Sequence, residues 1–586
     1  MYNSLMKKMR WNPKNLYDDV KSFDKDVVRL NKEIKKYGEI SRDVSTINKI
    51  HYLLKQEKRI DTILYKILTY IMIRKEVSNS EQLKYKEKEV NSIFSSYLIY
   101  TQKFEFAILG LSKDRQKRIL KSPQIKLYKR RLELIIDRKR KSSKKEEEFL
   151  THLDPITENI PSLYGQILKH ISYNDIETSQ NVYKKINNSN IKKLSRSEDR
   201  DIRRKVYQEK IKAFDKTSTA FTEILDISLK DKNVKSMLSK EKSPIEYVLK
   251  EDSLKERHIS IVLNSILKNK DIISKFLKLK KNILDTRKIY SYDEKYDAYP
   301  YKMSLNKALT MVEDSLSLFH NDSKQIFHNL AKKNHLHITS KTDTFIPYSG
   351  YCMNYGITSP YLFVYYQNDL DSGMTIAHEL GHVIHQEKMI KNNSFWDRDT
   401  SLIIHETASY THEIIFLLNL LNKTKNKKTK KKILFKLIQY YYDIFVLKGV
   451  TTKFERHLYK QVQNNKPLRT DILSQKYKEI QEEFKGKDFS LNKFSEKEWI
   501  GDERLTWSFY ELKYIIAFAL ANKIAFGIFH DDHTMINKFN KMMKLGDENT
   551  TRSILQLFET SFSGLDQLIQ DAFKTLDSLI EEFEEL

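Results

Sequence analysis

Two histidines and a glutamate with the spacing of a metal site lie in the segment Met374 to Lys388, which reads MTIAHELGHVIHQEK. His378 and His382 are four residues apart, so on a helix both rings leave one face about a turn apart, close enough to bind one tetrahedral Zn²⁺. Glu379 follows His378 directly and can act on water as a general base without being a ligand. The alternative is a pair of histidines one turn apart that bind nothing.

The residues around this motif predict a helix. Apolar side chains at helical spacing fall on the side away from the histidines, where they would pack into a core. They are Ile376, Leu380, Val383 and Ile384. Asp371 and Ser372 just upstream are candidate N-cap residues.

A third metal ligand is predicted in the apolar segment Leu402 to Leu421, which carries Glu406, His412 and Glu413. A carboxylate inside such a helix needs a partner, because burying an unpaired charge is costly or forces a pKa shift. Zn²⁺ would be that partner for Glu406. Glu413, two turns further on, falls on nearly the same face and could orient a ligand histidine.

Between Leu336 and Tyr366 the sequence changes to short aromatic and β-branched runs, LHIT, TFIPYSGYCMNYG and YLFVYY, broken by glycine and proline. They predict strands of a small sheet beside the metal helix. An extended peptide could be held there by strand addition, although a structural hairpin without a ligand is the alternative.

The rest of the chain predicts helices. Residues 10–110 contain successive helical patterns, a further helix is expected from Ser122 to Lys139, and residues 155–285 read as helical throughout. At 586 residues with 40% hydrophobic side chains, the chain is long enough for two or more lobes.

Composition favours a cytoplasmic protein. Cys352 is the single cysteine, so an internal disulfide is excluded, and the first twenty residues lack the apolar stretch of a signal peptide. The most apolar run, Tyr514 to Phe529, contains Lys523 and is too short to span a bilayer. We therefore expect no membrane partner.

The formal net charge of +26 raises the question of nucleic-acid binding. The densest basic runs are Lys129 to Lys145, which has the spacing of a solvated helix face, and Lys423 to Lys432, which is expected to be an exposed loop. No nucleic-acid-binding motif accompanies either run. The expectation is no nucleic-acid partner, with solubility as the role of the charge.

These segments together resemble the M3 zinc metallopeptidases of the oligoendopeptidase F type. HELGHVIH, and ETAS at Glu406 to Ser409 followed by Glu413, resemble that family's two metal-binding helices. PYSGY at Pro347 to Tyr351 and SPYLFVYY at Ser359 to Tyr366 resemble its two strands before the metal helix. Trp11-Asn12 with Asn15-Leu16-Tyr17 resembles its opening motif. The resemblance is strong over Gly350 to Glu413 and weak over almost the whole chain.

The resemblance implies a mainly α-helical, two-lobed zincin of the thimet oligopeptidase type, with a deep channel and a small β-sheet beside the metal helix. It implies an N-terminal helical lobe over residues 1–150 and a catalytic region over 151–586, with the metal site at 378–413. The implied enzyme is a zinc endopeptidase that hydrolyses short peptides, because the channel excludes folded proteins. Its oligomeric state is left open.

The site implied by this resemblance has one Zn²⁺ per chain. His378, His382 and Glu406 would hold it and Glu379 would be the general base. The supporting residues are His385 and Glu413, which would orient the ligands, and Gly350 and Tyr351, which would bind substrate. Tyr514, with Tyr510 and Arg504, would stabilise the oxyanion.

Arg504 is where the chain departs from the family pattern. Trp499 and Phe509-Tyr510 align with conserved family positions, and Arg504 then stands where the relatives have a histidine that helps to stabilise the oxyanion. It could supply positive charge to the same oxyanion, bind a substrate carboxylate, or only pair with Asp502 or Glu503. A peptide-binding protein with weak or lost turnover is therefore the alternative function.

Overall fold

The computed structural model describes residues 9–77, 81–137, 142–177, 183–188, 190–340, 349–354, 356, 358–398, 400–546 and 550–586. Helices make up most of these residues, and the strands are few and short. The predicted mainly α-helical fold is confirmed. Of the PYSGY motif, Pro347 and Tyr348 lie outside the described residues.

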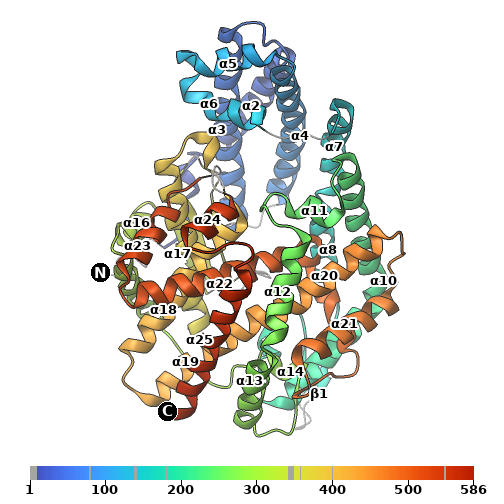
Figure 1. Ribbon diagram of the computed structural model, residues 1–586, viewed down its shortest axis with the longest axis vertical. Helices are drawn as coiled ribbons and strands as arrows, with labels where there is room; N and C mark the ends of the chain where they lie inside the picture. The colour runs from blue at the N-terminus through green and yellow to red at the C-terminus, as the bar shows by residue number, and fades with distance from the viewer. Residues whose placement is uncertain are drawn as a thin grey trace.

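A helical N-terminal lobe stands at the top of the molecule and is blue in Figure 1. Asp19 caps its first long helix by accepting a hydrogen bond from the backbone N–H of Ser22, and apolar side chains at helical spacing pack into a core of the lobe's own. The helices are α2 (Val20–Ile40), α3 (Ile47–Val77), α4 (Glu81–Leu109), α5 (Lys113–Lys121), α6 (Lys129–Asp137) and α7 (Lys144–Thr157).

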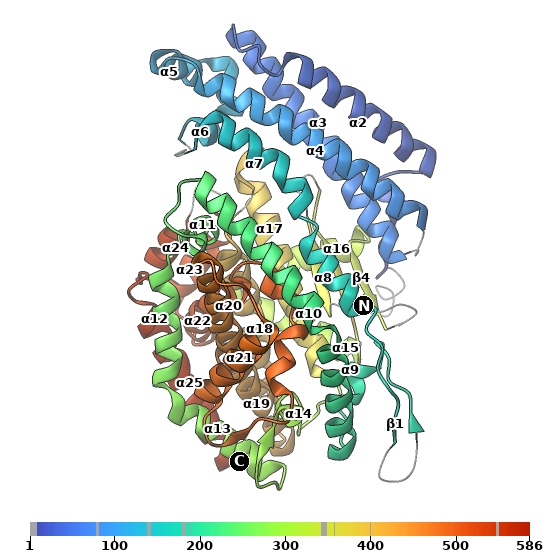
Figure 2. The same cartoon turned by 90° about the vertical axis from the view of Figure 1, so that its right-hand side faces the viewer.

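The junction between the lobes lies in α7. This helix contacts α4 of the N-terminal lobe and also α10 of the body, and the boundary expected at residue 150 falls inside it. Figure 2 shows α7 between the two groups of helices. The lobes are thus joined by a continuous helix.

The second part of the chain builds one flank of the body. Its longest element, α10, has 39 residues and begins at an N-cap, Asp199, whose side chain accepts backbone hydrogen bonds. The helices are α8 (Ile160–Lys169), α9 (Ile191–Leu194), α10 (Arg200–Leu238), α11 (Pro244–Leu249), α12 (Glu256–Lys268), α13 (Lys270–Ile283) and α14 (Ser291–Glu294).

The expectation that residues 155–285 are helical throughout is wrong at one place. β1 (Ile176–Glu177) pairs antiparallel with β2 (Tyr183–Lys184) in a two-stranded ribbon. The stretch Ser172 to Glu177 reads SYNDIE, whose Asn and Asp side chains compete with helical backbone hydrogen bonds and favour turns.

The remaining elements form the other part of the body. Its helices are α15 (Leu305–Leu316), α16 (Ser323–Lys332), α17 (Leu370–Asn392), α18 (Leu402–Lys423), α19 (Lys427–Tyr442), α20 (Lys448–Gln463), α21 (Thr470–Lys485), α22 (Tyr510–Phe529), α23 (His533–Met542), α24 (Thr551–Leu557) and α25 (Leu565–Glu585). Its strands are β3 (Ile289–Tyr290), β4 (Leu336–Thr339), β5 (Gly350–Met353), β6 (Tyr361–Tyr365) and β7 (Phe489–Ser490).

The predicted small sheet is present and lies against α17. Its order is β4-β6-β5, with β4 parallel and β5 antiparallel to β6, so β6 is central and both β5 and β4 are edge strands among the described residues. The two faces of β6 belong to different cores. Leu362 and Val364 pack into the core of the body, whereas Tyr361 and Phe363 pack into the core of the N-terminal lobe.

The N-terminal segment adds to this contact. Trp11 donates an indole hydrogen bond of 3.0 Å to the carbonyl of His335, and its ring meets the edges of Tyr361 and His337. The sheet is therefore the interface between the two lobes.

Helix α22 is long and apolar enough to cross a membrane, but 67% of its most apolar window is buried inside the molecule. It packs against α18, α20 and α25. Its apolar surface is therefore part of the protein core.

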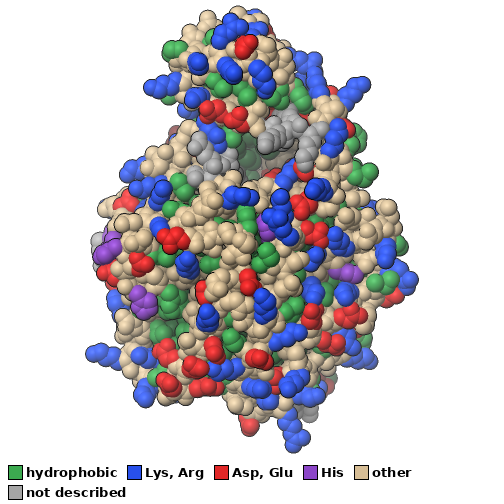
Figure 3. Space-filling model, viewed as in Figure 1, with side chains coloured by type: hydrophobic (Ala, Val, Ile, Leu, Met, Phe, Trp, Pro, Cys, Tyr) green, Lys and Arg blue, Asp and Glu red, His purple; other side chains and the backbone are tan. Residues whose placement is uncertain are grey.

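Positive charge is spread over the visible surface rather than gathered in one patch, with acidic side chains between the basic ones (Figure 3). The run Lys423 to Lys432, expected to be a loop, instead forms mainly the first turns of α19. Asn426 caps this helix on Thr429, and Ile433 and Leu434 anchor it in the core.

Candidate active site

Helix α17 carries the two histidines and begins earlier than predicted. Its N-cap is Asp369, which has an extended backbone and accepts a 2.8 Å hydrogen bond from the N–H of Ser372. Asp371 and Ser372, expected as caps, are inside the first turn. All three residues can cap, but Asp369 is the one whose carboxylate reaches the third backbone N–H of the helix.

A close crossing brings α18 to this helix. A Cβ atom on Gly381 would lie 2.7 Å from the Cα of Ser409, so only glycine allows the two backbones this close. The crossing places Glu406 of α18 beside the histidines of α17. The predicted third residue thus joins the pair through tertiary packing.

The three predicted ligands converge. Nε2 of His378 lies 3.4 Å from Oε2 of Glu406, and Nε2 of His382 lies 3.7 Å from its Oε1. All three donor atoms fall within 4.8 Å of one another. His320, Asp531 and His533 form a second such group in the described chain, but they are exposed, whereas Glu406 is buried.

The donor set fits a divalent metal ion such as Zn²⁺. Two imidazole nitrogens and one carboxylate are ligands that zinc prefers, and three protein ligands leave a position for a reactant. Oε2 of Glu406 is buried without a hydrogen-bond partner among the residues described. An ion between the three side chains would satisfy that oxygen.

Electrostatics favour the ligating forms of Glu406 and His382, whereas for His378 the lowering effect of burial is outweighed by Glu406 and Glu413, which raise its pKa. Burial alone would raise the pKa of Glu406, but His382, His378 and the hydroxyl of Tyr514 lower it to about 2. Burial lowers the pKa of His382 to about 3, with His378 adding repulsion. An ionised carboxylate and a neutral imidazole are the protonation states that bind metal.

Glu413 makes the contact expected of it. Its Oε2 is 3.0 Å from Nδ1 of His378, which directs Nε2 of that ring toward Glu406. The hydroxyl of Tyr440 donates a 2.5 Å hydrogen bond to the same oxygen. Tyr440 was not predicted from the sequence. It is one of three consecutive tyrosines on α19, and nothing in the sequence distinguishes the one that contacts Glu413.

His385 does not make the corresponding contact. Its side chain is fully buried, and neither ring nitrogen has a hydrogen-bond partner in the described chain. The ring lies edge-on to His405 with 4.9 Å between centroids. Its influence on His382 would therefore act through packing.

Glu379 lies under the edge strand. A Cβ on Gly350 would be 3.0 Å from Cγ of Glu379 and 2.6 Å from Cγ2 of Thr375, so a side chain there would displace the strand from α17. The backbone of Cys352 hydrogen bonds with the Glu379 carboxylate, while burial raises the pKa of that carboxyl to about 7. A carboxyl group with this pKa can exchange protons near neutral pH.

The backbone of β5 is oriented for a further strand. Tyr365 donates a 2.8 Å hydrogen bond to the carbonyl of Ser349, so by antiparallel alternation the backbone groups of Gly350 point away from β6. The ring of Tyr351 packs toward Trp11 and Phe363 on the other face. By the same alternation the backbone N–H and C=O of Tyr351 point toward β6, so neither these groups nor the ring face the open edge.

Tyr510 and Tyr514 join the site from α22. The hydroxyl of Tyr514 donates a 2.6 Å hydrogen bond to Oε1 of Glu406, and the two tyrosine hydroxyls are 2.5 Å apart. Tyr410 of α18, another residue missed from sequence, meets the ring of His378 edge-on at 5.4 Å. The tyrosines thus form one wall of the site.

Arg504 stands before α22 and is held by carboxylates. Its Nε donates a 2.7 Å hydrogen bond to Asp502, and its Nη1 pairs with Glu511. The pairing with Asp502 is one of the alternatives predicted from the sequence, whereas the pairing with Glu511 was not predicted. The guanidinium lines a cavity of about 330 Å³ that also contains Tyr207, Lys210 and Lys448.

Comparison with protein families gives one match. The model of peptidase family M3 matches residues 325–564, a range that contains every predicted metal ligand.

Curated relatives match much more of the chain at low identity. Oligopeptidase PepF of Bacillus subtilis (strain 168) is 21% identical over 492 residues, covering 82% of this chain and 72% of the relative. Group B oligopeptidase PepB of Streptococcus agalactiae serotype III (strain NEM316) is 22% identical over 542 residues, covering 89% and 88%. The crystal structure of oligoendopeptidase-F from Enterococcus faecium superimposes with a TM-score of 0.76 at 17% identity, over 96% of this chain and 98% of that one.

Proposed function

We propose that this chain, whose residues 325–564 match the model of peptidase family M3, is a zinc-dependent endopeptidase of that family that hydrolyses short oligopeptides in an enclosed channel. The observation that carries the proposal is the convergence of His378, His382 and Glu406 beside the buried carboxylate of Glu379. Three metal donors and an adjacent base are the groups that metal-assisted hydrolysis of a peptide bond uses.

His378, His382 and Glu406 would hold one Zn²⁺ per chain. When bound, the ion would supply Lewis-acid charge to the scissile carbonyl. Glu413 keeps the ring of His378 in one orientation, and Tyr440 keeps Glu413 in place. These contacts reduce the reorganisation needed to bind the ion.

Glu379 would be the general base and then the general acid. Its carboxylate accepts a proton from the attacking water and passes it to the leaving nitrogen. The backbone contact from Cys352 fixes the carboxylate, and its raised pKa suits both proton transfers. Tyr514 and Tyr510 would donate hydrogen bonds to the developing oxyanion.

The substrate would lie along β5 as an added strand. The outward backbone groups of Gly350 would pair with the peptide, and Tyr351 would hold this strand in place through the packing of its ring. Two cavities that share Asp443 extend the site along α19 and α20, which supports a channel rather than an open surface cleft. A channel of this kind admits extended peptides and excludes folded proteins.

A peptide-binding protein with weak turnover is the second candidate. It is favoured by the pairing of Arg504 with Asp502 and Glu511. This pairing occupies two guanidinium N–H donors that could otherwise stabilise the oxyanion in place of the histidine of the relatives. We place the protein in the cytoplasm in either case, with peptides rather than nucleic acid or a membrane as its partner.

Metal analysis combined with cleavage of a quenched-fluorescent peptide library tests the proposal. We expect one Zn²⁺ per chain, cleavage that a chelator abolishes, and loss of zinc in His382→Ala and Glu406→Ala. Full zinc occupancy in both variants would refute the ligand assignment. Peptide binding without turnover in the zinc-loaded protein would favour the second candidate.

A further inference from the structure

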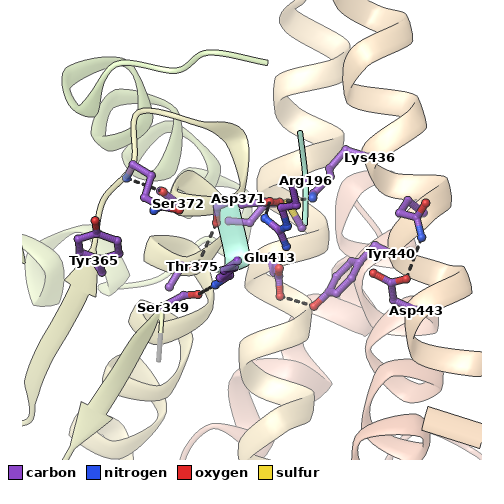
Figure 4. Close-up of a pocket in the computed structure, with 14 residues that line it drawn as sticks. Arg196, Ser349, Tyr365, Asp371, Ser372, Thr375, Glu413, Lys436, Tyr440 and Asp443 are labelled. Carbon is purple, nitrogen blue, oxygen red and sulfur yellow. Dashed lines mark hydrogen bonds and ion pairs between the residues drawn. The ribbon is translucent and has the colours of Figure 1, made fainter. Parts of the chain in front are cut away.

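A charged cavity of about 240 Å³ opens beside the predicted active site (Figure 4). It is lined by Thr375 of α17, one turn before Glu379, and by Glu413, the partner of His378. Ser349, directly before β5, lies at its rim. The cavity therefore borders both the catalytic helix and the start of the edge strand.

Three cationic side chains reach this cavity from different parts of the chain. Lys192 comes from α9, Arg196 from the segment before α10, and Lys436 from α19. Arg196 lies 3.3 Å from Asp371, and Lys436 pairs with the same carboxylate. Both side chains still have N–H groups beyond those in this pairing.

Lys192 has the most donor capacity left. Its side chain is exposed to the cavity, and its hydrogen-bond partner in the described chain is the hydroxyl of Ser349 at 3.5 Å. An ammonium has three N–H donors, and a single long contact to a neutral hydroxyl leaves most of that capacity available. The Arg196 side chain is also 41% exposed.

Each acidic group of the cavity already has a hydrogen-bond or ion-pair partner. Oε2 of Glu413 accepts from both His378 and Tyr440, and Oδ1 of Asp443 accepts a 2.8 Å hydrogen bond from Gln439. Asp371 is shared by two cations. The cavity thus offers donors and positive charge, and its complement is an anionic group rich in acceptors.

We infer that Lys192, with Arg196 and Lys436, binds a carboxylate of the peptide substrate, either its C-terminus or an acidic side chain. The inference rests on the proposed function. A peptide that lies along β5 and passes Glu379 would reach this cavity at Ser349, directly before β5. A carboxylate held there would fix how many residues extend beyond the cleaved bond. The site would then select peptides by length and charge.

A structural role for the cations is the competing explanation, since Arg196 and Lys436 bridge α17 to neighbouring elements through Asp371. Lys192 separates the two explanations. Among the described residues Asp371 forms ion pairs with Arg196 and Lys436 but not with Lys192, whose hydrogen bond goes to Ser349. Lys193 is its matched control. It is the next residue of the same short helix, is exposed, and does not line the cavity.

The experiment compares peptides that are identical except for a free or an amidated C-terminus. For the unmodified enzyme we expect kcat/KM about tenfold higher for the free acid, mainly through KM, as a charged hydrogen bond would give. Lys192→Ala should remove most of this preference while kcat/KM for the amide stays within about twofold. Lys192→Arg should retain the preference, and Lys193→Ala should leave it unchanged.

The source of the carboxylate is found with amidated peptides that carry Glu at successive positions after the cleaved bond. Recovery of the preference at one position would identify an acidic side chain as the ligand, whereas no recovery would identify the C-terminus. Equal kcat/KM for acid, amide and Glu-containing peptides would overturn the inference. An equal loss for acid and amide in Lys192→Ala would do so as well.

A binding measurement keeps the inference separate from the proposed function. Fluorescence anisotropy with labelled acid and amide peptides on the Glu379→Gln variant reports affinity without turnover. Tighter binding of the acid that depends on Lys192 would support the carboxylate site even if no peptide were hydrolysed. Cleavage without any acid preference would instead refute the carboxylate site and leave the peptidase activity established.

Discussion

The hydroxyl of Tyr514 donates a 2.6 Å hydrogen bond to Oε1 of Glu406, across 108 residues of sequence. The contact ties α22 to the third metal ligand and places a phenol next to the metal position. Tyr510 in turn lies 2.5 Å from the Tyr514 hydroxyl. A small rotation of Tyr514 would transfer its hydrogen bond from Glu406 to a substrate oxyanion.

Tyr514→Phe should therefore retain zinc and lose activity. Loss of one oxyanion donor typically costs about 10²- to 10³-fold in kcat. Zinc content and peptide cleavage measured on the same preparation check this, with Tyr85→Phe, at an exposed tyrosine on α4 of the N-terminal lobe, as the control. Normal kcat in Tyr514→Phe would show that the hydroxyl serves only Glu406.

Glu379→Gln should also retain zinc and should lose nearly all turnover, because an amide cannot accept the proton of the attacking water. Product formation is measured by mass spectrometry over long incubation, with the enzyme expressed in a host that cannot contribute the unmodified protein. Substantial residual cleavage under those conditions would remove Glu379 as the base.

Gly381→Ala tests the close crossing of α17 and α18. The added Cβ would meet the Cα of Ser409 at 2.7 Å, so the helices must separate, at a cost of about 1–3 kcal/mol for overpacking. Thermal unfolding should shift to lower temperature, and zinc affinity should fall because Glu406 moves with α18. In Gly110→Ala, the control, the nearest contact would be an unstrained 3.4 Å. Unchanged stability and zinc affinity in Gly381→Ala would contradict the close contact.

Arg504→Ala addresses the departure from the family pattern. If the guanidinium uses its remaining donors on the oxyanion, as the resemblance to the family implies, kcat and kcat/KM should fall together by at least about tenfold. An effect on KM alone that disappears with amidated peptides would assign Arg504 to a substrate carboxylate. Kinetics within about twofold of the unmodified enzyme on both kinds of peptide would show that pairing with Asp502 and Glu511 is its whole role.

The stability of the sheet should depend on pH. Burial lowers the pKa of His335 and of His337 to about 4, against about 6.5 in an unfolded chain. Between these values the unfolded state binds protons that the folded state does not, so folding stability is lost as pH falls from 6.5 toward 4. Each histidine can contribute up to about 3 kcal/mol to that loss.

His337→Leu should reduce this acid sensitivity, because Nδ1 of His337 is buried without a hydrogen-bond partner in the described chain and leucine removes the titrating group. Urea unfolding at several values between pH 7 and pH 4.5 measures the slope. His320→Ala, which changes an exposed histidine, is the control. An identical slope in His337→Leu and the unmodified protein would exclude His337 as a source.

The convergence of His378, His382 and Glu406 could be predicted from sequence because the signals of these residues are local. His378 and His382 share a helix face by spacing alone, and Glu406 is conspicuous as a carboxylate in an apolar helix. The start of α17 was misplaced by two residues because Asp369, Asp371 and Ser372 all have capping side chains, and only the backbone geometry distinguishes them.

The groups around the ligands could not be predicted. Tyr440 reaches Glu413 only because α19 packs on α18, and Lys192 approaches Ser349 from 157 residues away in sequence. Each is an ordinary residue in its own segment. Their importance arises from tertiary packing, which composition and periodicity do not encode.

The sheet that borders the site has no independent solvent face. Because Tyr361 and Phe363 pack on the N-terminal lobe while Leu362 and Val364 pack on the body, removing the first 150 residues would expose an aromatic surface directly behind β5. Such a fragment would keep all its metal ligands and still aggregate or lose the geometry of its substrate strand. Adding the lobe back as a separate polypeptide should restore solubility, because the lobe would again cover Tyr361 and Phe363.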